Sequence, residues 1–380
     1  MDNEYYNYFV STAENIIESG TAPNSFKVRE CAGSPVSDSS AARFHSSHLN
    51  SINNLDEELK RFESLFSNGN NSVFWASDYN DVFESLRKLF KLYKVKSVRL
   101  PSVKSSTIFR EIGIKDFLSD CKIELAEDGA MQFFAADMLF SDTGSILLLN
   151  QTNTTFSRLS NSKINVFFTT VDKIVSSSSW AETIQQLSSY SNNCGRQDMV
   201  IFHSSPNCKS YLFVIDNQRS CVLSNKSLRP ALSCIGCGRC SDVCPVFQTI
   251  GETPYNNVFS GPVANITLPY LETFESYMHV AYACTLCGRC EEVCPLSLPI
   301  RDMVVESRRT ILSEGVLPRR QRRALSLLHK YLTNRSKLNR SAFFKRHLLL
   351  FFLSPALRHS RRIPSFSPET LNKSLRKPHV

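Results

Sequence analysis

The sequence predicts an α/β domain with a largely parallel sheet, followed by a mainly helical, cysteine-rich domain and a basic helical tail. Three observations predict this organisation. Strand and helix patterns alternate from residue 55 to residue 216, as they do in proteins with parallel sheets. Two runs of four cysteines, at 234–244 and 284–294, are each followed by a helical pattern. Residues 301–380 hold 19 Lys and Arg against four Asp and Glu, whereas the preceding part is mildly acidic.

The bulk composition is that of a globular protein. Of the 380 residues, 42% are hydrophobic and 21% are charged, which is ordinary for a folded chain of two or three domains. The first residues, MDNEYYNYFV, lack the basic and apolar regions of a secretory signal. The longest apolar patch, at 347–353, is far short of the roughly 20 residues that a membrane-spanning helix needs. We therefore expect a cytoplasmic protein.

Changes in composition suggest four segments. Residues 1–50 are rich in Ser and Asn and predict a polar, partly disordered leader with one short helix near 5–18. Residues 51–228 are expected to form the α/β domain. A shift to Cys, Gly and Pro near residue 230 marks the start of the cysteine-rich domain, 229–315. Residues 316–380 then form the basic tail.

Hydrophobic periodicity predicts each element of the α/β domain. The helix expected over 55–66 places Leu55, Leu59, Phe62 and Leu65 on one face. Further helices are expected over 81–95 and 181–190. Buried strands are expected over 72–76, 96–101, 198–203 and 210–216. Residues 133–150 predict two strands around a tight SDTGS turn, and residues 164–175 predict a strand that runs into the start of a helix.

The two cysteine runs share one spacing, C-x2-C-x2-C-x3-C-P. In the bacterial ferredoxins with this spacing, three cysteines of a run hold one [4Fe–4S] cluster and the fourth holds the other. The prediction is therefore two [4Fe–4S] clusters with crossed ligands. Cluster 1 would be held by Cys234, Cys237, Cys240 and Cys294. Cluster 2 would be held by Cys284, Cys287, Cys290 and Cys244.

Zinc is the alternative metal, but structural zinc sites typically use two separated C-x2-C pairs rather than a tight triplet and a fourth cysteine. Pro245 and Pro295 follow the fourth cysteines and are expected to turn the chain away and remove a competing N–H donor. Arg239 and Arg289 occupy equivalent positions in the two runs. Either they raise the potentials of the clusters by their positive charge, or they are plain surface side chains. The remaining cysteines are expected to be free, buried or half-buried thiols: Cys31, Cys121, Cys194, Cys208 and Cys221.

Helical patterns lie between and after the cysteine runs, at 268–283 and 299–315, with Gly315 as the expected stop of the second. Small ferredoxins instead join their runs by a β-rich segment. The helical arrangement resembles the two-cluster ferredoxin domain of succinate dehydrogenase, glycolate oxidase and heterodisulfide reductase iron–sulfur subunits. A domain of this kind relays single electrons and has no substrate site of its own.

Three segments of the α/β domain resemble the lactate-utilisation (LUD) domain family, with a likeness that covers roughly residues 50–315. The family shows an A-D-x5-T-G-[ST] segment, a strand that ends near K-[IL]-V and a strand that closes in D-N-G-R-[ST]. The matching residues are Ala136, Asp137, Thr143, Gly144 and Ser145, then Lys173, Ile174 and Val175, then Asp216, Asn217, Arg219 and Ser220. Gln218 stands in place of the usual glycine, and Asp142 stands where the family often has Glu.

The resemblance implies a fold similar to sugar-phosphate isomerases and CoA transferases. It also implies an iron–sulfur electron-transfer subunit of a complex that oxidises L-lactate to pyruvate. The expected partners are a cysteine-rich subunit of the heterodisulfide-reductase type and a second LUD protein. Two alternatives stay open: the iron–sulfur subunit of another 2-hydroxy-acid (glycolate) or quinone-linked oxidoreductase, and a LUD enzyme with CoA-transferase-like or isomerase-like activity and regulatory clusters.

A small-molecule pocket in the α/β domain would use Asp137, Asp142, Thr143 and Gly144. The simpler interpretation makes SDTGS a turn chosen for its backbone conformation. His203, at the end of a predicted strand, is expected to make a local hydrogen bond rather than to act as a base. The sequence shows neither a Gly-rich phosphate loop nor a nucleophile elbow, so flavin or nicotinamide binding is not predicted.

The basic tail mixes arginines with apolar residues at 319–332 and 341–362. We expect it to dock on an acidic partner subunit. The alternatives are an interfacial helix on anionic lipid, which would give peripheral membrane contact, and a solvated extension. Nucleic-acid binding is not expected, because no recognised nucleic-acid-binding fold accompanies the charge.

Overall fold

The computed structural model describes residues 38–68, 70–101, 107–127, 129–149, 159, 162–189, 199–203, 208–255 and 261–315, and single positions at 11, 319, 322, 323, 326, 329, 330 and 333. The chain divides into two compact units, Met1–Arg309 and Thr310–Val380. Apart from these single positions, the predicted helix near 5–18 and the basic tail lie outside the described residues, as do Cys31 and Cys194. No helix among the described residues is both long and apolar enough to cross a membrane.

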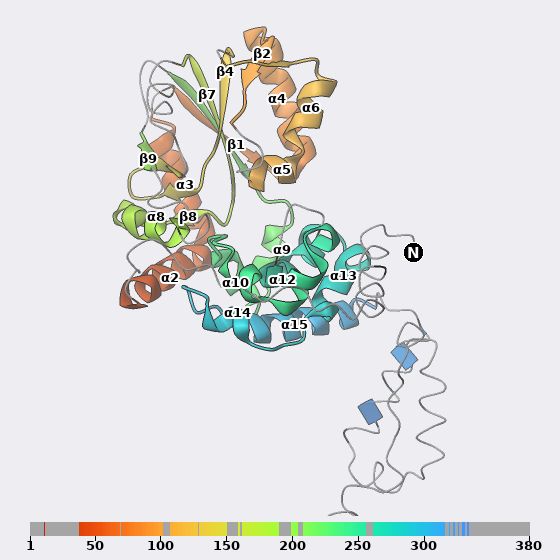
Figure 1. The fold of residues 1–380 in the computed structure, drawn as a ribbon. Coiled ribbons are helices and arrows are strands. Elements are labelled where there is room, and N and C mark those ends of the chain that lie inside the picture. The colour runs from red at the N-terminus through yellow and green to blue at the C-terminus, as the bar shows by residue number, and fades with distance from the viewer. Residues whose placement is uncertain are drawn as a thin grey trace, which may run out of the picture. The chain divides into compact units, whose positions relative to one another are not determined.

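A six-stranded parallel sheet forms the centre of the α/β domain (Figure 1). Its strands, in spatial order, are β1 (Asn71–Ala76), β10 (Lys209–Ile215), β7 (Ile164–Thr170), β4 (Met131–Ala135), β2 (Ser97–Arg99) and β3 (Glu124–Leu125). All five pairings are parallel, as the alternation of strands and helices predicts. The central strand β7 is buried along its whole length, which suits a sheet that is covered on both faces. Trp75 corrects one expectation: because β1 is an edge strand, this side chain is 46% exposed.

A second, four-stranded sheet was not expected from the sequence. Its order is β8 (Ile174–Val175), β5 (Met138–Phe140), β6 (Ser145–Leu149) and β9 (Met199–Phe202). Strands β5 and β6 form the predicted hairpin, in which Phe140 pairs with Ser145 across the SDTGS turn. The prediction that residues 164–175 enter a helix is wrong. Instead, Ile174 and Val175 are buried beside β5, where they pair in parallel with Leu139 and Phe140.

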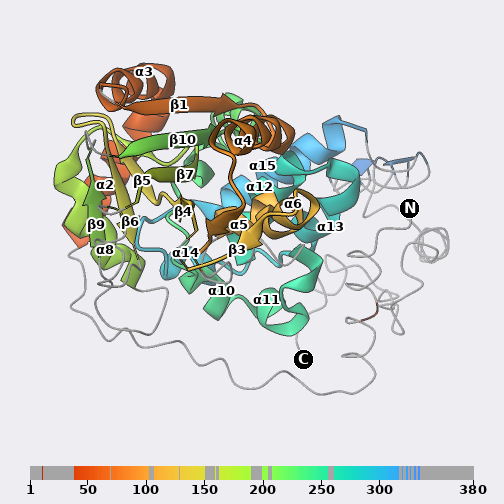
Figure 2. The same ribbon diagram turned by 90° about the horizontal axis from the view of Figure 1, so that it is seen from above.

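Helices cover the six-stranded sheet on one face, and the second sheet with one helix covers the other (Figure 2). The first layer contains α4 (Tyr79–Tyr93), α5 (Thr107–Ile112) and α6 (Ile114–Asp120). The opposite helix is α3 (Leu55–Phe66), as predicted, although Phe66 rather than Leu65 completes its buried face. Helix α8 (Ala181–Ser189) also lies where the periodicity places it.

The expected leader is ordered over its last residues. Helix α2 (Asp38–Asn53) begins inside the segment predicted to be partly disordered. Ala41, Phe44, His48 and Ile52 are buried at helical intervals along it. Because this apolar stripe is interrupted by Ser, Arg and His, composition alone hides it.

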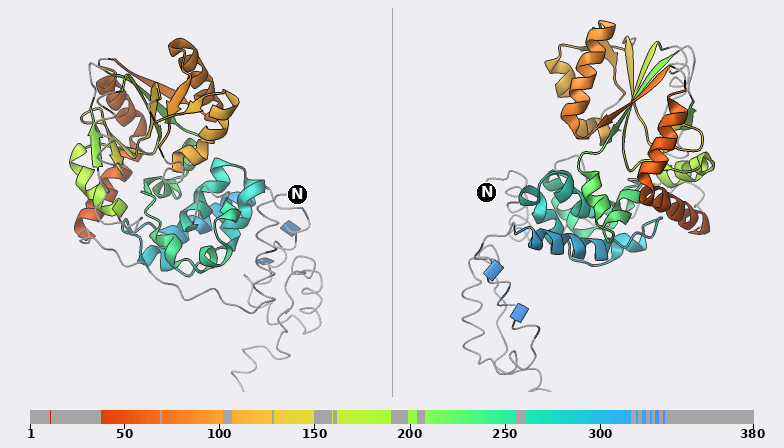
Figure 3. Two further views of the ribbon diagram at one scale, coloured as in Figure 1. Left: turned by 45° about the horizontal axis from the view of Figure 1, so that its top comes forward. Right: turned by 180° about the vertical axis from the view of Figure 1, so that it is seen from behind.

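The cysteine-rich domain is helical, as predicted (Figure 3). Helix α9 (Arg219–Ser224) precedes this domain. The elements of the domain are η3 (Arg229–Ser233), α10 (Arg239–Val243), α11 (Pro245–Ile250), η4 (Thr253–Tyr255), α12 (Gly261–Leu271), α13 (Phe274–Ala283), α14 (Arg289–Glu292) and α15 (Ile300–Ser313). The single helix expected over 268–283 is two helices, because α12 ends at Leu271 and the Thr273 hydroxyl caps α13 by accepting from the Ser276 N–H. Gly315 has a φ of +72°, which suits its expected position after α15.

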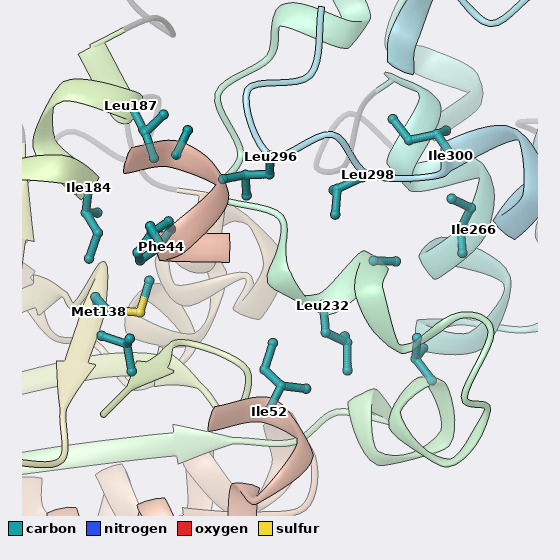
Figure 4. Packing of buried hydrophobic residues seen from close by; sticks show 14 of the residues in the cluster. Phe44, Ile52, Met138, Ile184, Leu187, Leu232, Ile266, Leu296, Leu298 and Ile300 are labelled. Carbon is teal, nitrogen blue, oxygen red and sulfur yellow. The ribbon is translucent and has the colours of Figure 1, made fainter. Parts of the chain in front are cut away.

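One hydrophobic core joins the α/β and cysteine-rich domains (Figure 4). It contains Phe44 and Ile52 from α2, Met138 from the second sheet, and Leu232 and Ile266 from the cysteine-rich domain. The change of composition near residue 230 therefore marks a change from α/β to helical structure, but the two domains share one hydrophobic core.

Candidate iron–sulfur centre

The two cysteine runs fold into loops with the same backbone conformation. Gly238 and Gly288 have φ values of +73° and +85° and stand directly before α10 and α14. Two residues earlier, Gly236 and Leu286 are also left-handed, with φ values of +71° and +57°. The repeat in the sequence is thus a repeat in the structure, although one of its four left-handed positions holds leucine.

Backbone N–H groups point at the first cysteine of each loop in the same way. The Gly236 N–H donates to Cys234 Sγ over 3.4 Å, and the Leu286 N–H donates to Cys284 Sγ over 3.4 Å. Such donors stabilise a thiolate, the form in which cysteine binds metal.

A cavity lies against the second loop. Cys284, Cys287 and Cys290 line it together with Cys244, the fourth cysteine of the first loop. The rest of its wall is mostly apolar, with Val246, Pro262, Leu286 and Ile300, and carries one cation, Arg301. The fourth cysteine of one run therefore faces the triplet of the other.

The remaining cysteines gather in the reciprocal way. Burial raises the pKa of Cys237 to about 12, and the neighbouring charges of Cys234 and Cys294 act in the same direction. Burial and the charges of Cys234, Cys237 and Cys294 also raise the pKa of Cys240. Cys294 thus lies with the first triplet. The charge of Cys290 also raises the pKa of Cys240, and α10 packs against α14. The two sets of cysteines are therefore neighbours.

The donor set fits an iron–sulfur cluster. A [4Fe–4S] cluster takes four cysteine thiolates, and its iron offsets the charge that burial disfavours here. A second observation concerns Tyr255, which is fully buried with no hydrogen-bond partner for its hydroxyl among the described residues. Burial raises its pKa, and the charges of Cys244 and Cys284 add to that effect, so the hydroxyl lies near these thiols. A cluster sulfur would give this orphaned donor an acceptor.

The first cysteine of each loop has its backbone carbonyl held by a cation. Lys173 Nζ donates to the Cys234 carbonyl oxygen over 2.7 Å. The Arg308 guanidinium donates to the Cys284 carbonyl oxygen and, over 2.9 Å, to that of Ala281. The spacing of the cysteines does not predict that Tyr255 or Arg308 lies near them. Lys173 belongs to the K-[IL]-V segment of the family resemblance, which does not predict this contact either.

The other residues singled out beside the cysteines differ between the loops. Arg239 is half-buried, and its charge lowers the pKa of Cys237, whereas Arg289 is exposed. Pro245 is the first residue of α11, where its missing N–H costs no helical hydrogen bond. Pro295 is half-buried in the turn that follows Cys294.

A buried network of charges connects the carboxyl ends of the parallel strands with the first loop. Arg219, after β10, is 6% exposed and bonds Glu111 over 2.8 Å and Asp172 over 3.1 Å. Asp172, after β7, also pairs with Lys173 over 3.3 Å, and its backbone oxygen bonds His48 Nε2 over 3.0 Å. Ligands often bind at this edge of an open α/β sheet. In this protein Lys173 reaches from it to the cysteine-rich domain.

The four candidate pocket residues are engaged in local hydrogen bonds or packing. Asp137 accepts from the Leu149 N–H over 2.7 Å, and burial raises its pKa to about 7. Asp142 accepts from the Ser178 N–H over 2.9 Å, and Thr143 bonds the Ser145 hydroxyl over 2.6 Å.

Gly144 has a φ of +64°, and a Cβ on it would lie 2.7 Å from Leu65 Cβ, so the SDTGS turn packs tightly on α3. None of the four candidate residues lines the cavity beside the second loop. These contacts favour the interpretation of SDTGS as a turn.

Three further expectations concern single residues. His203 is exposed directly after β9. Gln218, which replaces the usual glycine, has a φ of +65°. Glycine adopts such a left-handed conformation readily, which explains why the family segment has glycine at this position. Of the cysteines outside the runs, Cys208 is buried and Cys121 is half-buried, as expected, whereas Cys221 is exposed.

Comparisons with known proteins agree with this geometry. The family model of the 4Fe-4S dicluster domain matches residues 230–298. Lactate utilization protein B of Exiguobacterium sp. is 28% identical over 206 residues, which are 53% of this chain and 42% of that protein. Lactate utilization protein B of Anoxybacillus flavithermus is 30% identical over 109 residues, which are 28% of this chain and 23% of that protein.

Among solved structures, a DUF162 family protein from Deinococcus radiodurans is similar with a TM-score of 0.30 and 11% identity, covering 43% of this chain and 98% of that one. The matched parts of the chain span less than half the length of the curated relatives. The predicted resemblance is nevertheless confirmed: the chain is similar to the lactate utilization proteins, and its residues 230–298 match a 4Fe-4S dicluster domain.

Proposed function

We propose that the chain is an electron-transfer protein with two [4Fe–4S] clusters. Cluster 1 is held by Cys234, Cys237, Cys240 and Cys294, and cluster 2 by Cys284, Cys287, Cys290 and Cys244. The observation that carries the proposal is the cavity that Cys244 shares with the triplet of the other run. The match to a dicluster domain supports it as well.

The clusters would supply one-electron carriers, and the chain positions them as a relay. Cys240 and Cys290, the third cysteines of the two loops, lie where the two sets approach each other. Cys287 is exposed and would bring cluster 2 within reach of a partner for electron exchange. Cys290 is buried and would hold cluster 2 against the protein interior.

The relay serves a complex that oxidises L-lactate to pyruvate, a role supported by the names of the relatives. The reaction releases two electrons, and a catalytic partner would pass them on one at a time. The partners we propose are a cysteine-rich subunit of the heterodisulfide-reductase type and a second LUD protein. The basic tail would dock on an acidic surface of such a subunit, with contact to anionic lipid as the alternative. The whole assembly would be cytoplasmic.

The test is an anaerobic preparation of the full chain. We expect about eight irons, from the count of ligands, and a brown absorbance near 400 nm that dithionite bleaches. L-lactate should bleach the chain only in the presence of its partners, and glycolate should bleach it less. Bleaching by lactate of the chain alone would contradict the relay. Stronger bleaching by glycolate would favour the alternative 2-hydroxy acid.

A further inference from the structure

The α/β domain donates a hydrogen bond to the Cys234 carbonyl oxygen of the first cysteine loop. The equivalent atom of the second loop, the Cys284 carbonyl oxygen, accepts from a residue of the cysteine-rich domain instead. We propose that Lys173 of the α/β domain raises the potential of cluster 1, so that this domain tunes one cluster of the relay selectively. The inference rests on the proposed assignment of two clusters.

The contact itself places positive charge at the first ligand of cluster 1. Lys173 Nζ donates to the Cys234 carbonyl oxygen over 2.7 Å. The Lys173 side chain is 27% exposed, so water screens this charge only partly. Hydrogen bonds and positive charge close to a cluster favour its reduced, more negative state.

The position of Lys173 is set by the network behind it. Asp172 bonds Lys173 over 3.3 Å, and Arg219 bonds both Asp172 and Glu111. His48 is held neutral, because burial lowers its pKa to about 4. The network therefore has two cations and two carboxylates. Loss of the Lys173 charge alone would leave a net negative charge beside cluster 1, which would disfavour its reduction.

In the second loop, too, a cation donates to the carbonyl oxygen of the first cysteine, but this cation comes from another domain. Its equivalent atom, the Cys284 carbonyl oxygen, accepts from Arg308 of α15. Arg308 belongs to the cysteine-rich domain and also lies over the ring of Tyr282, 5.7 Å from its centroid. One cluster is thus served by a cation from the α/β domain and the other by a cation from the cysteine-rich domain. This difference supplies a matched pair of variants.

The experiment is an anaerobic redox titration of the full chain, followed by electron paramagnetic resonance. The signal that disappears in Cys294→Ser is assigned to cluster 1. We expect Lys173→Met to move the midpoint of cluster 1 to a more negative potential and to leave that of cluster 2 in place. Lys173→Arg, which keeps the charge, should restore the parent value, and Arg308→Met should lower the midpoint of cluster 2 instead.

The outcomes separate this inference from the proposed function. A Lys173→Met chain with about eight irons and an unmoved cluster 1, or with both midpoints moved equally, would overturn the inference alone. A parent chain with about four irons would overturn the two-cluster assignment and the inference with it. If Lys173→Met does not retain cluster 1, Lys173→Gln, which keeps an N–H donor without the charge, is titrated in its place.

Discussion

The two cysteine loops are alike in backbone and different in surroundings. Each has a left-handed residue two positions after its first cysteine, a left-handed glycine before a short helix, and an N–H directed at the first sulfur. Loop 1 (234–244) is held by Lys173 from the α/β domain, whereas loop 2 (284–294) is held by Arg308 from α15. The comparison teaches that the repeat sets the backbone conformation of each loop, while the neighbouring elements set how the surroundings of the two loops differ.

The largest effect should come from the fourth cysteines, because the proposed assignment makes each of them a ligand of the other loop's cluster. We expect Cys244→Ser to remove or strongly weaken cluster 2 and to leave most of cluster 1. Cys294→Ser should do the reverse. Iron content and the paramagnetic signals of the reduced chain measure both variants. Loss of the cluster on the variant's own loop would show that the loops are two closed sites and would end the crossed assignment.

Much of this architecture could be predicted from sequence because local patterns specify it. Strong periodicity places α3, α4 and α8, and short apolar runs place β7 and β10. The cysteine spacing predicts that Cys244 lies with the triplet of the other run, because ferredoxins with this spacing cross their ligands in this way.

The remaining features depend on contacts between distant segments. Ile174 and Val175 form β8 only because β5 lies beside them, and α2 is ordered because Phe44 and Ile52 enter the shared core. Lys173, Arg308 and Tyr255 approach the cysteines through tertiary packing, for which a single sequence holds no spacing rule. A lysine near the end of a strand resembles any surface lysine until the fold shows what it touches.

Arg219 supports loop 1 indirectly, through Asp172 and Lys173. Arg219→Met would remove the cation that the buried carboxylates of Glu111 and Asp172 share, and their side chains are only 5% and 8% exposed. We expect the free energy of unfolding in urea to fall by about 3–5 kcal/mol. Cluster 1 should also be lost to a chelator faster than cluster 2, because Asp172 holds Lys173.

Lys60→Met is the matched control for this variant. It breaks an ion pair with Asp56 whose side chains are 77% and 75% exposed, and should cost less than about 0.5 kcal/mol. Equal costs for the two variants would show that the buried network contributes nothing to loop 1.

A pH dependence should arise on the side of loop 1 from His48. This side chain is fully buried among Asp172, Lys173 and His45, and burial lowers its pKa to about 4. Below pH 6.5 the unfolded chain binds a proton at His48 that the folded chain refuses, so stability falls as the pH falls. Between pH 7.5 and 5.5 the parent should lose about 1.4 kcal/mol more than His48→Gln in urea unfolding. Parallel curves would show that His48 binds its proton as readily in the folded chain as in the unfolded chain.

The smallest expected effect tests whether the loops are equivalent in backbone. A Cβ on Gly236 would meet no protein atom within 4 Å, so Gly236→Ala should cost only the left-handed conformation, about 1 kcal/mol in urea unfolding. Leu286 already bears that conformation in loop 2, where its side chain packs against the shared core. Iron content and both paramagnetic signals should stay at the parent level. Loss of cluster 1 in Gly236→Ala would show that the cluster fills the space beside this residue, and the loops would then differ in room as well as in support.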